Sequence, residues 1–138
     1  SSCASMSPDD PCRPRVLVVD DTPENRRLFY FYLRREYDVA DAASGEEALA
    51  ALRALPADAV LLDLTLGAGM SGLETLAALR AEAALAHLPV LALTAHASPA
   101  DRARCLAAGF DAYLSKPVLR GALLQAVADL LAPTPPHR

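Results

Sequence analysis

Ala59-Val60-Leu61-Leu62-Asp63 joins four consecutive apolar residues to one acid. A second apolar run, Val-Leu-Val-Val at residues 16–19, precedes two aspartates, and a third, Val-Leu-Ala-Leu, lies at residues 90–93. Short unbroken apolar runs are typical of strands in a parallel sheet whose two faces are both buried. These three segments therefore predict the central strands of an α/β protein.

Polar side chains follow each of these strands at the point where it ends. Asp20 and Asp21 follow the run at the start of the chain, Asp63 follows the next, and Thr94 follows the third. A fourth strand-like segment, Ala-Tyr-Leu-Ser, is followed by Lys116. The carboxyl ends of parallel strands share the edge of the sheet where ligands bind. Three carboxylates, a hydroxyl and an ammonium at that edge predict a site for a divalent cation and a phosphoryl group.

Helix signals alternate with these strand signals along the chain. Thr22-Pro23 and Ser98-Pro99 each place a capping hydroxyl before a proline that fits a first helical turn, and Ser44-Gly-Glu-Glu47 has the form of a capping box. The predicted strands are 15–19, 38–42, 59–62, 90–93 and 111–114, and the predicted helices are 23–36, 45–55, 72–83, 99–108 and 119–131. This alternation predicts a parallel sheet covered by helices on both faces, with right-handed crossovers.

Composition limits the classes of function. The chain has 138 residues, 53% of them hydrophobic, and a formal net charge of −4. One domain is expected at this length, and an acidic chain without a basic patch argues against direct binding to nucleic acid. Charge or proline interrupts every apolar run well before the roughly 20 residues of a membrane span, so we expect no membrane segment in this chain. The N-terminus lacks the pattern of a signal peptide.

The two ends of the chain are expected to be tails or linkers. Residues 1–14 hold little to bury, and residues 133–138, Pro-Thr-Pro-Pro-His-Arg, cannot continue a helix. The predicted domain therefore covers residues 15–132. Three unpatterned cysteines, at positions 3, 12 and 105, are expected to be free thiols of a reducing, cytoplasmic compartment. The first residue is not Met, so we expect either a single-domain protein or a fragment of a longer one.

The strand ends resemble the signature of response-regulator receiver domains. The matching stretches are Val18-Val19-Asp20-Asp21, Leu61-Leu62-Asp63, Leu93-Thr94-Ala95 and Tyr113-Leu114-Ser115-Lys116-Pro117. The resemblance covers nearly all of the predicted domain. It implies a flavodoxin-like, doubly wound sheet of five parallel strands in the order 2-1-3-4-5, with five helices. It also implies a two-component phosphorelay whose partner is a histidine kinase or a histidine phosphotransfer protein.

The acidic residues are assigned to phosphorylation and to metal binding. A carboxylate can attack phosphorus and form an aspartyl phosphate, and we expect Asp63 to be the phosphoacceptor. Crowded carboxylates need a cation, and Mg²⁺ suits a site of oxygen ligands beside a phosphate. Asp63 and Asp21 are the expected direct ligands, and Asp20 is expected to act through metal-bound water. The resemblance implies the backbone carbonyl of Thr65 as a further ligand.

The remaining site residues are assigned to the phosphoryl group and to a switch. We expect Lys116 to pair with one phosphoryl oxygen as a point charge and the Thr94 hydroxyl to donate to another. The resemblance implies that Thr94 then moves toward the phosphate, that Tyr113 turns inward, and that the Lys116–Pro117 peptide is cis. Taken singly, Thr94 and Tyr113 are more often structural residues.

Two other functions stay open at the level of sequence. An aspartate-nucleophile phosphohydrolase needs an acid–base carboxylate two residues after its nucleophile, and those positions here are Thr65 and Thr22. A degenerate receiver that acts only as a protein-interaction module is the second alternative. We expect a phosphoacceptor that assists its own Mg²⁺-dependent chemistry and has no separate substrate to turn over.

The first predicted helix carries an aromatic run, Phe29-Tyr30-Phe31-Tyr32. With Leu28, Phe29, Tyr32 and Leu33 expected to face the sheet, Tyr30 and Phe31 fall on opposite flanks. Exposed aromatic residues are typical interface anchors, and in receivers this helix is where the phosphodonor docks. Tyr30 and Phe31 are therefore candidates for partner docking, although covering the edges of the helix is an equally good interpretation.

One segment departs from the family pattern. Receivers usually place Met-Pro three and four residues after the phosphorylated aspartate and a glycine eight after it. Here the stretch is Asp63-Leu-Thr-Leu-Gly-Ala-Gly-Met-Ser-Gly72, without proline and with its last glycine nine residues on. We expect a loop that is one residue longer and looser, which bears on the geometry of the Thr65 ligand and on the lifetime of the phosphorylated state.

Overall fold

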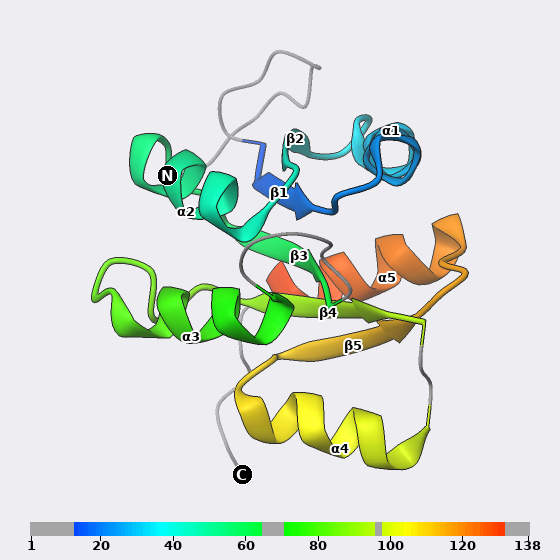
Figure 1. Cartoon of the computed structure of the whole chain (residues 1–138). Helices are drawn as coiled ribbons and strands as arrows, with labels where there is room; N and C mark the ends of the chain where they lie inside the picture. Colours follow the sequence, from blue (N-terminus) through cyan, green and yellow to red (C-terminus); the bar gives the residue numbers. More distant parts are fainter. Residues whose placement is uncertain (1–12, 65–70, 96–97, 132–138) are drawn as a thin grey trace, which may run out of the picture.

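The computed structural model describes residues 13–64, 71–95 and 98–131. Five parallel strands form one sheet in the order β2-β1-β3-β4-β5 (Figure 1). The strands are β1 (Arg15–Val19), β2 (Asp38–Ala42), β3 (Ala59–Asp63), β4 (Val90–Thr94) and β5 (Ala112–Ser115). The helices are α1 (Pro23–Leu33), α2 (Gly45–Ala54), α3 (Gly72–Ala81), α4 (Pro99–Ala108) and α5 (Arg120–Leu131). The predicted strand order and alternation are confirmed.

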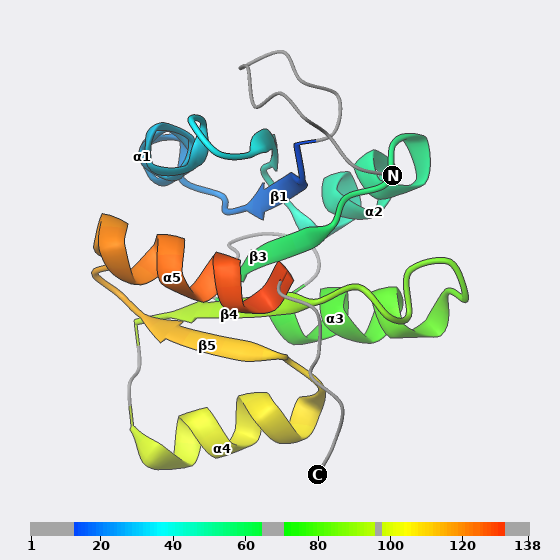
Figure 2. The same cartoon turned by 180° about the vertical axis from the view of Figure 1, so that it is seen from behind.

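Alternate residues of the central strands enter two separate cores. In β1, Val16 and Val18 join the core under α1 and α5, whereas Leu17 and Val19 join the core under α2 and α3. This two-residue alternation explains why the central strands are apolar at every position. Figure 2 shows α1 and α5 on the near side of the sheet, opposite α2 and α3. The buried residue of α4 is Cys105, which belongs to the α2 and α3 side.

Three strands end one residue later than predicted, β3, β4 and β5, and β5 also begins one residue later; the ends of β3 and β4 place the site. Asp63 and Thr94 are the last residues of β3 and β4, and both remain in the strand pairing, Asp63 opposite Leu93 and Thr94 opposite Ser115. Asp20 follows β1 directly, and its N–H donates to the carbonyl of Ala42 at 3.1 Å. The sheet itself therefore positions these side chains.

Helix α1 ends at Leu33, three residues before the predicted end. The guanidinium of Arg13 donates to the backbone carbonyls of Arg34 and Tyr37 just beyond it, and these bonds satisfy carbonyls that a continuing helix would have used. Arg13 lies in the segment that we predicted to be a tail, yet it is buried. Ordered contacts thus begin at least two residues before the predicted boundary.

Helix α3 likewise ends at Ala81 rather than at residue 83. Nη1 of Arg80 donates to the carbonyls of Ala86 and Leu88, and Nη2 donates to the carbonyl of Gly109 and to the Asp111 carboxylate. One side chain therefore holds the turn after α3 against the turn before β5. The sequence shows no local pattern for this arrangement, because the acceptors lie up to 31 residues away.

Candidate functional site

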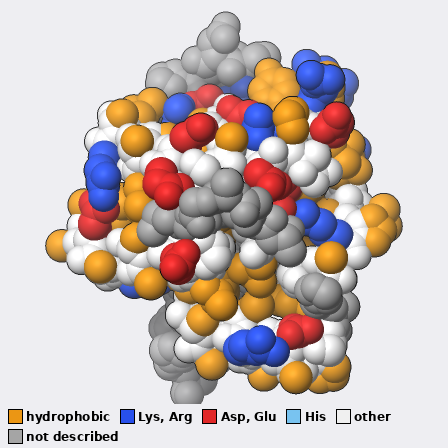
Figure 3. All heavy atoms as spheres, in the orientation of Figure 1, with side chains coloured by type: hydrophobic (Ala, Val, Ile, Leu, Met, Phe, Trp, Pro, Cys, Tyr) orange, Lys and Arg blue, Asp and Glu red, His pale blue; other side chains and the backbone are white. Residues whose placement is uncertain are grey.

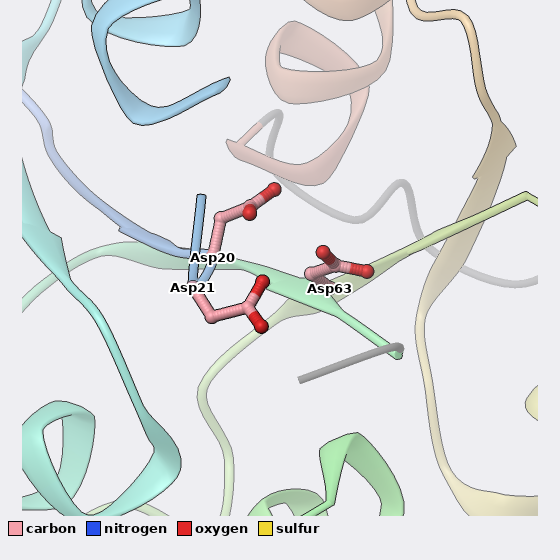
Figure 4. Close-up of side chains that lie close together, drawn as sticks. All are labelled: Asp20, Asp21 and Asp63. Atoms are coloured by element: carbon pink, nitrogen blue, oxygen red, sulfur yellow. The ribbon is translucent and has the colours of Figure 1, made fainter. Parts of the chain in front are cut away.

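Three carboxylates meet at the carboxyl edge of the sheet. Asp20 and Asp21 follow β1, and Asp63 ends β3. One oxygen from each lies within 4.8 Å of the others, and the three side chains face a common space (Figure 4). Asp20 and Asp63 are 0% and 1% exposed, whereas Asp21 is exposed. Figure 3 shows further Asp and Glu side chains around the middle of this face. The predicted acidic cluster therefore forms, with one member open to solvent.

Local hydrogen bonds orient the buried carboxylate of Asp20. Its Oδ1 accepts from the Thr22 backbone N–H at 2.8 Å, and its Oδ2 accepts from the Asn25 amide at 3.3 Å. Burial raises the pKa of Asp20, the Thr22 N–H opposes that rise, and the charge of Asp63 adds to it. A carboxylate that is costly to ionise beside another carboxylate is one that gains from a bound cation.

Lys116 enters the site from the end of β5. Its Nζ donates to Oδ2 of Asp63 at 2.9 Å and lies 3.6 Å from Oδ2 of Asp20. Its backbone N–H donates to the Thr94 carbonyl at 2.7 Å, which ties the end of β5 to the end of β4. The Lys116–Pro117 peptide is cis, as the resemblance implied. Lys116 is thus placed to meet a group bound to Asp63.

Thr94 and Tyr113 occupy different environments. Thr94 is buried at the end of β4, next along the sheet edge from Asp63. Tyr113 is half-buried and packs against the core that lies under α2 and α3. In the sheet register Tyr113 pairs with Ala92, two residues before Thr94. The structure therefore brings the two residues onto neighbouring strands, and their roles as a switch stay a prediction.

The loop after Asp63 falls largely outside the described residues. This applies to Thr65, Gly67 and Gly69, so the predicted carbonyl ligand and the predicted looseness of the loop stay predictions. Where the chain is described again, Gly72 begins α3 beside the site. A Cβ on Gly72 would lie 2.8 Å from Cα of Leu64 and 3.0 Å from the carbonyl oxygen of Asp63. The start of α3 therefore packs directly on the backbone of the acidic residue.

The donor set fits a hard divalent cation. Its ligand atoms are carboxylate oxygens, two of the three acids are buried, and Lys116 pairs with both Asp20 and Asp63. Mg²⁺ prefers oxygen ligands and retains some of its water molecules. Because Asp21 is exposed, water can reach an ion bound at this cluster. We read the cluster as a candidate magnesium site.

The aromatic run on α1 is only partly as predicted. Tyr30 and Phe31 are exposed, but their rings touch edge to face with centroids 5.9 Å apart, so they form one patch rather than two opposite flanks. The guanidinium of Arg34 lies 5.1 Å from the Phe31 ring centre. Leu28, which was predicted to face the sheet, is 42% exposed, because Phe29 and Leu33 fill that face.

Sequence reasoning missed three residues that act on this edge of the sheet. Asn25 contacts the Asp20 side chain, Arg26 contacts its backbone carbonyl, and Gly72 packs against Asp63 and Leu64. The signal for Asn25 and Arg26 was their place in the first turns of a helix that begins directly after an acidic pair.

Among the described helices, none is long and apolar enough to cross a membrane.

Comparisons with known proteins agree with this geometry. Residues 16–128 match the family described as the response regulator receiver domain. The chain is 37% identical over 118 residues to the sensor histidine kinase GacS of Pseudomonas protegens, which covers 83% of the chain and 13% of the kinase. It is 33% identical over 104 residues to the polar-differentiation response regulator DivK of Brucella ovis, which covers 75% of the chain and 84% of DivK.

Solved structures show the same fold. The chemotaxis protein CheY4 of Vibrio cholerae superposes with a TM-score of 0.81 at 30% identity, covering 87% of this chain and all (100%) of CheY4. The receiver domain of the Pseudomonas aeruginosa sensor histidine kinase PA1611 was solved with magnesium in its active site cleft. It superposes with a TM-score of 0.77 at 32% identity, covering 86% of this chain and 97% of the PA1611 domain. The chain spans a quarter or less of the first curated relatives, 25% and 13% of their lengths. With its family match, fold and acidic edge in agreement, the chain belongs to the response regulator receiver domains.

Proposed function

We propose that Asp63 accepts a phosphoryl group from a phosphohistidine, with Mg²⁺ held by Asp20, Asp21, Asp63 and the carbonyl of Thr65. Membership of the receiver family makes the chain a phosphoacceptor module of two-component signalling. The observation that carries the assignment to Asp63 is its central position. It is the buried carboxylate that both belongs to the acidic cluster and accepts a hydrogen bond from Lys116.

The chemistry follows from these groups. An oxygen of Asp63 attacks phosphorus, the P–N bond to the donor histidine breaks, and its electron pair returns to the imidazole, which takes a proton. The product is an acyl phosphate on Asp63. Most of the catalysis lies in positioning the groups and in stabilising charge on the phosphoryl oxygens. Mg²⁺ held by these residues would supply part of that stabilisation, and Lys116, whose Nζ lies 2.9 Å from Oδ2 of Asp63, would supply a further positive charge.

The added group then biases a two-state equilibrium. Lys116 already bonds Oδ2 of Asp63, so phosphorylation exchanges this bond for one to a phosphoryl oxygen. We propose that the Thr94 hydroxyl bonds a second oxygen and that Tyr113 turns inward, which remodels the surface of α4, β5 and α5. Conformation shifts because the new group binds one arrangement of these loops better than the other.

The partner is proposed to be a histidine kinase or a histidine phosphotransfer protein. The GacS and DivK relatives support this class of partner. The comparisons favour a receiver over a phosphohydrolase, and neither Thr22 nor Thr65 supplies the acid–base carboxylate that a phosphohydrolase needs. A cytoplasmic location and the lack of direct contact with nucleic acid stay predictions. Labelling with acetyl phosphate, with and without a chelator, tests the phosphoacceptor and the metal dependence of this function.

Substitutions of Lys116 and Thr94 are expected to affect different steps, phosphorylation in the first case and the conformational response in the second. Lys116→Ala should slow labelling by acetyl phosphate at least tenfold, because a positive charge beside the phosphoryl oxygens is lost. Thr94→Ala should leave labelling largely intact and weaken the conformational response, measured as chemical-shift changes across α4 and β5 on adding beryllofluoride. If Thr94→Ala abolishes labelling in a folded protein, the division of roles between the two residues is wrong.

The aromatic patch of Tyr30 and Phe31 is expected to serve the protein donor alone. Phe31→Ala should reduce phosphoryl transfer from the donor protein, since an interface anchor is worth about 2 kcal/mol or more, and should leave labelling by acetyl phosphate unchanged. Leu55→Ala is the matched control, because Leu55 is equally exposed but lies after α2. Equal loss with both donors would point to misfolding, and equal loss in the control would remove the patch from the interface.

A further inference from the structure

Arg26 joins three parts of the molecule beside the acidic cluster. It lies in the first turns of α1, its Nη1 donates to the backbone carbonyl of Asp20 at 2.5 Å, and its Nε pairs with Oδ2 of Asp41 at 3.0 Å. Asp41 is on β2, the edge strand next to β1. The guanidinium therefore ties the start of α1 to the ends of two neighbouring strands.

These contacts complete the support around Asp20. Its N–H is held by Ala42, its carboxylate by Thr22 and Asn25, and its carbonyl by Arg26. The bond from Arg26 is charge-assisted and hence stronger than a neutral one. Because each polar group of Asp20 makes a hydrogen bond, both its backbone and its side chain are held in one orientation. A ligand that is already oriented needs no ordering when a metal binds.

We propose that Arg26, held by Asp41, is a positioning residue for the metal site of this receiver, and that it acts by fixing the backbone of Asp20. The inference rests on the proposed magnesium site. Arg26 does not need to touch the metal or the phosphoryl group. Asp41 orients the guanidinium, and the guanidinium orients the β1–α1 junction that carries both Asp20 and Asp21.

Electrostatics alone predicts the opposite effect for Arg26. A fixed positive charge near a cluster of carboxylates repels a divalent cation, so removing that charge should tighten Mg²⁺ binding. Positioning predicts that Mg²⁺ binding weakens instead. Arg26→Gln removes the charge at nearly the same length, and the sign of the change in Mg²⁺ affinity separates the two effects.

The chain contains a matched control pair. Arg15 and Asp38 form a 2.6 Å ion pair that also joins β1 to β2, but at the opposite end of the strands. The carboxylates of Asp38 and Asp41 are similarly exposed, 56% and 60%. Asp38→Asn and Asp41→Asn therefore remove the same charge and the same kind of ion pair from one strand. Only the second reaches Asp20 through its partner.

The experiment is a calorimetric titration of Mg²⁺ into wild type, Arg26→Gln, Asp41→Asn, Asp38→Asn and the double variant of Arg26 and Asp41, with urea unfolding of each. We expect the dissociation constant to rise roughly tenfold in Arg26→Gln, the low end for residues that support metal ligands. It should rise by a similar or smaller factor in Asp41→Asn, remain unchanged in Asp38→Asn, and be no higher in the double variant than in Arg26→Gln.

Unchanged or tighter Mg²⁺ binding by folded Arg26→Gln would overturn the inference, as would an equal loss in Asp38→Asn. Should Arg26→Gln not fold, Asp41→Asn decides when it is titrated at low and high salt, because it keeps the arginine and changes an exposed residue: a loss of long-range attraction for Mg²⁺ is screened by salt, whereas a loss of positioning persists. Failure of the proposed function is distinguishable, since wild type itself would then bind no Mg²⁺ or would not be labelled on Asp63. Labelling by acetyl phosphate offers a second readout. Arg26→Gln should need more Mg²⁺ for half-maximal rate and reach a near-normal rate at saturation.

Discussion

Asp63→Asn is expected to abolish phosphorylation by acetyl phosphate in Mg²⁺. The amide nitrogen that replaces one carboxylate oxygen is a poor nucleophile, and the uncharged side chain no longer attracts the cation. Asparagine has nearly the same shape, so the buried position at the end of β3 should tolerate it. Intact-mass spectrometry reads the result directly as the presence or absence of one added phosphoryl group. A chelator such as EDTA should block labelling of wild type as completely as the substitution does.

The control for this variant is Asp129→Asn. Asp129 is exposed on α5, where it accepts a hydrogen bond from Gln125, and it takes no part in the acidic cluster. It carries the same charge change and should label like wild type. Undiminished labelling of Asp63→Asn would transfer the phosphoacceptor role to another residue. Labelling of wild type in the presence of the chelator would instead remove the metal from the proposed function.

Gly72→Ala is expected to destabilise the domain and to disturb the site together. The added Cβ would meet Cα of Leu64 at 2.8 Å and the carbonyl oxygen of Asp63 at 3.0 Å, and both are backbone atoms that cannot rotate away. Overpacking of this kind costs about 1–3 kcal/mol of unfolding free energy. Since the strain falls on Asp63, which ends β3, and on Leu64, which follows it, Mg²⁺ affinity should decrease as well. Urea unfolding and calorimetric titration measure the two effects.

Gly121→Ala is the matched control, because nothing lies within 4 Å of a Cβ at that position in α5. Alanine is the better helix former, so this variant should raise the free energy of unfolding by up to about 1 kcal/mol and leave Mg²⁺ binding unchanged. Equal stability of Gly72→Ala and wild type would mean that α3 can move away from the end of β3 without cost. The close approach would then not constrain the site.

Much of the candidate site was predictable because its residues are identified by short segments of the sequence. Asp63 and Thr94 end strands that are recognisable from apolar runs of four residues, and Lys116 directly follows the shorter β5. Parallel topology then collects the strand ends at one edge of the sheet. The order of the strands, by contrast, was implied by the resemblance to the receiver family, because alternation alone predicts a parallel sheet without fixing which strands are neighbours. None of these inferences needs the distance between two elements.

Features that depend on the distance between two elements were not predicted. The exposure of Leu28, the early end of α1 at the carbonyls bonded by Arg13, and the turns held by Arg80 all follow from how neighbouring elements approach one another. Each involves a long side chain that reaches backbone carbonyls, or a competition for one buried face. Helical periodicity cannot rank Leu28 against Phe29 and Leu33 when all three are apolar, because the packing of the sheet decides which of them is covered.

The residues of the acidic edge can be identified from the amino-acid sequence, because strand pattern and side-chain chemistry are properties of short segments. The contacts that hold that edge in place depend on the packing of distant segments. Arg26 meets Asp41 across 15 positions of sequence, and Gly72 meets Leu64 where a helix begins against the end of a strand. Both contacts arise from the packing of α1 and α3 against the sheet, and they exist only at the separations that the packed core enforces.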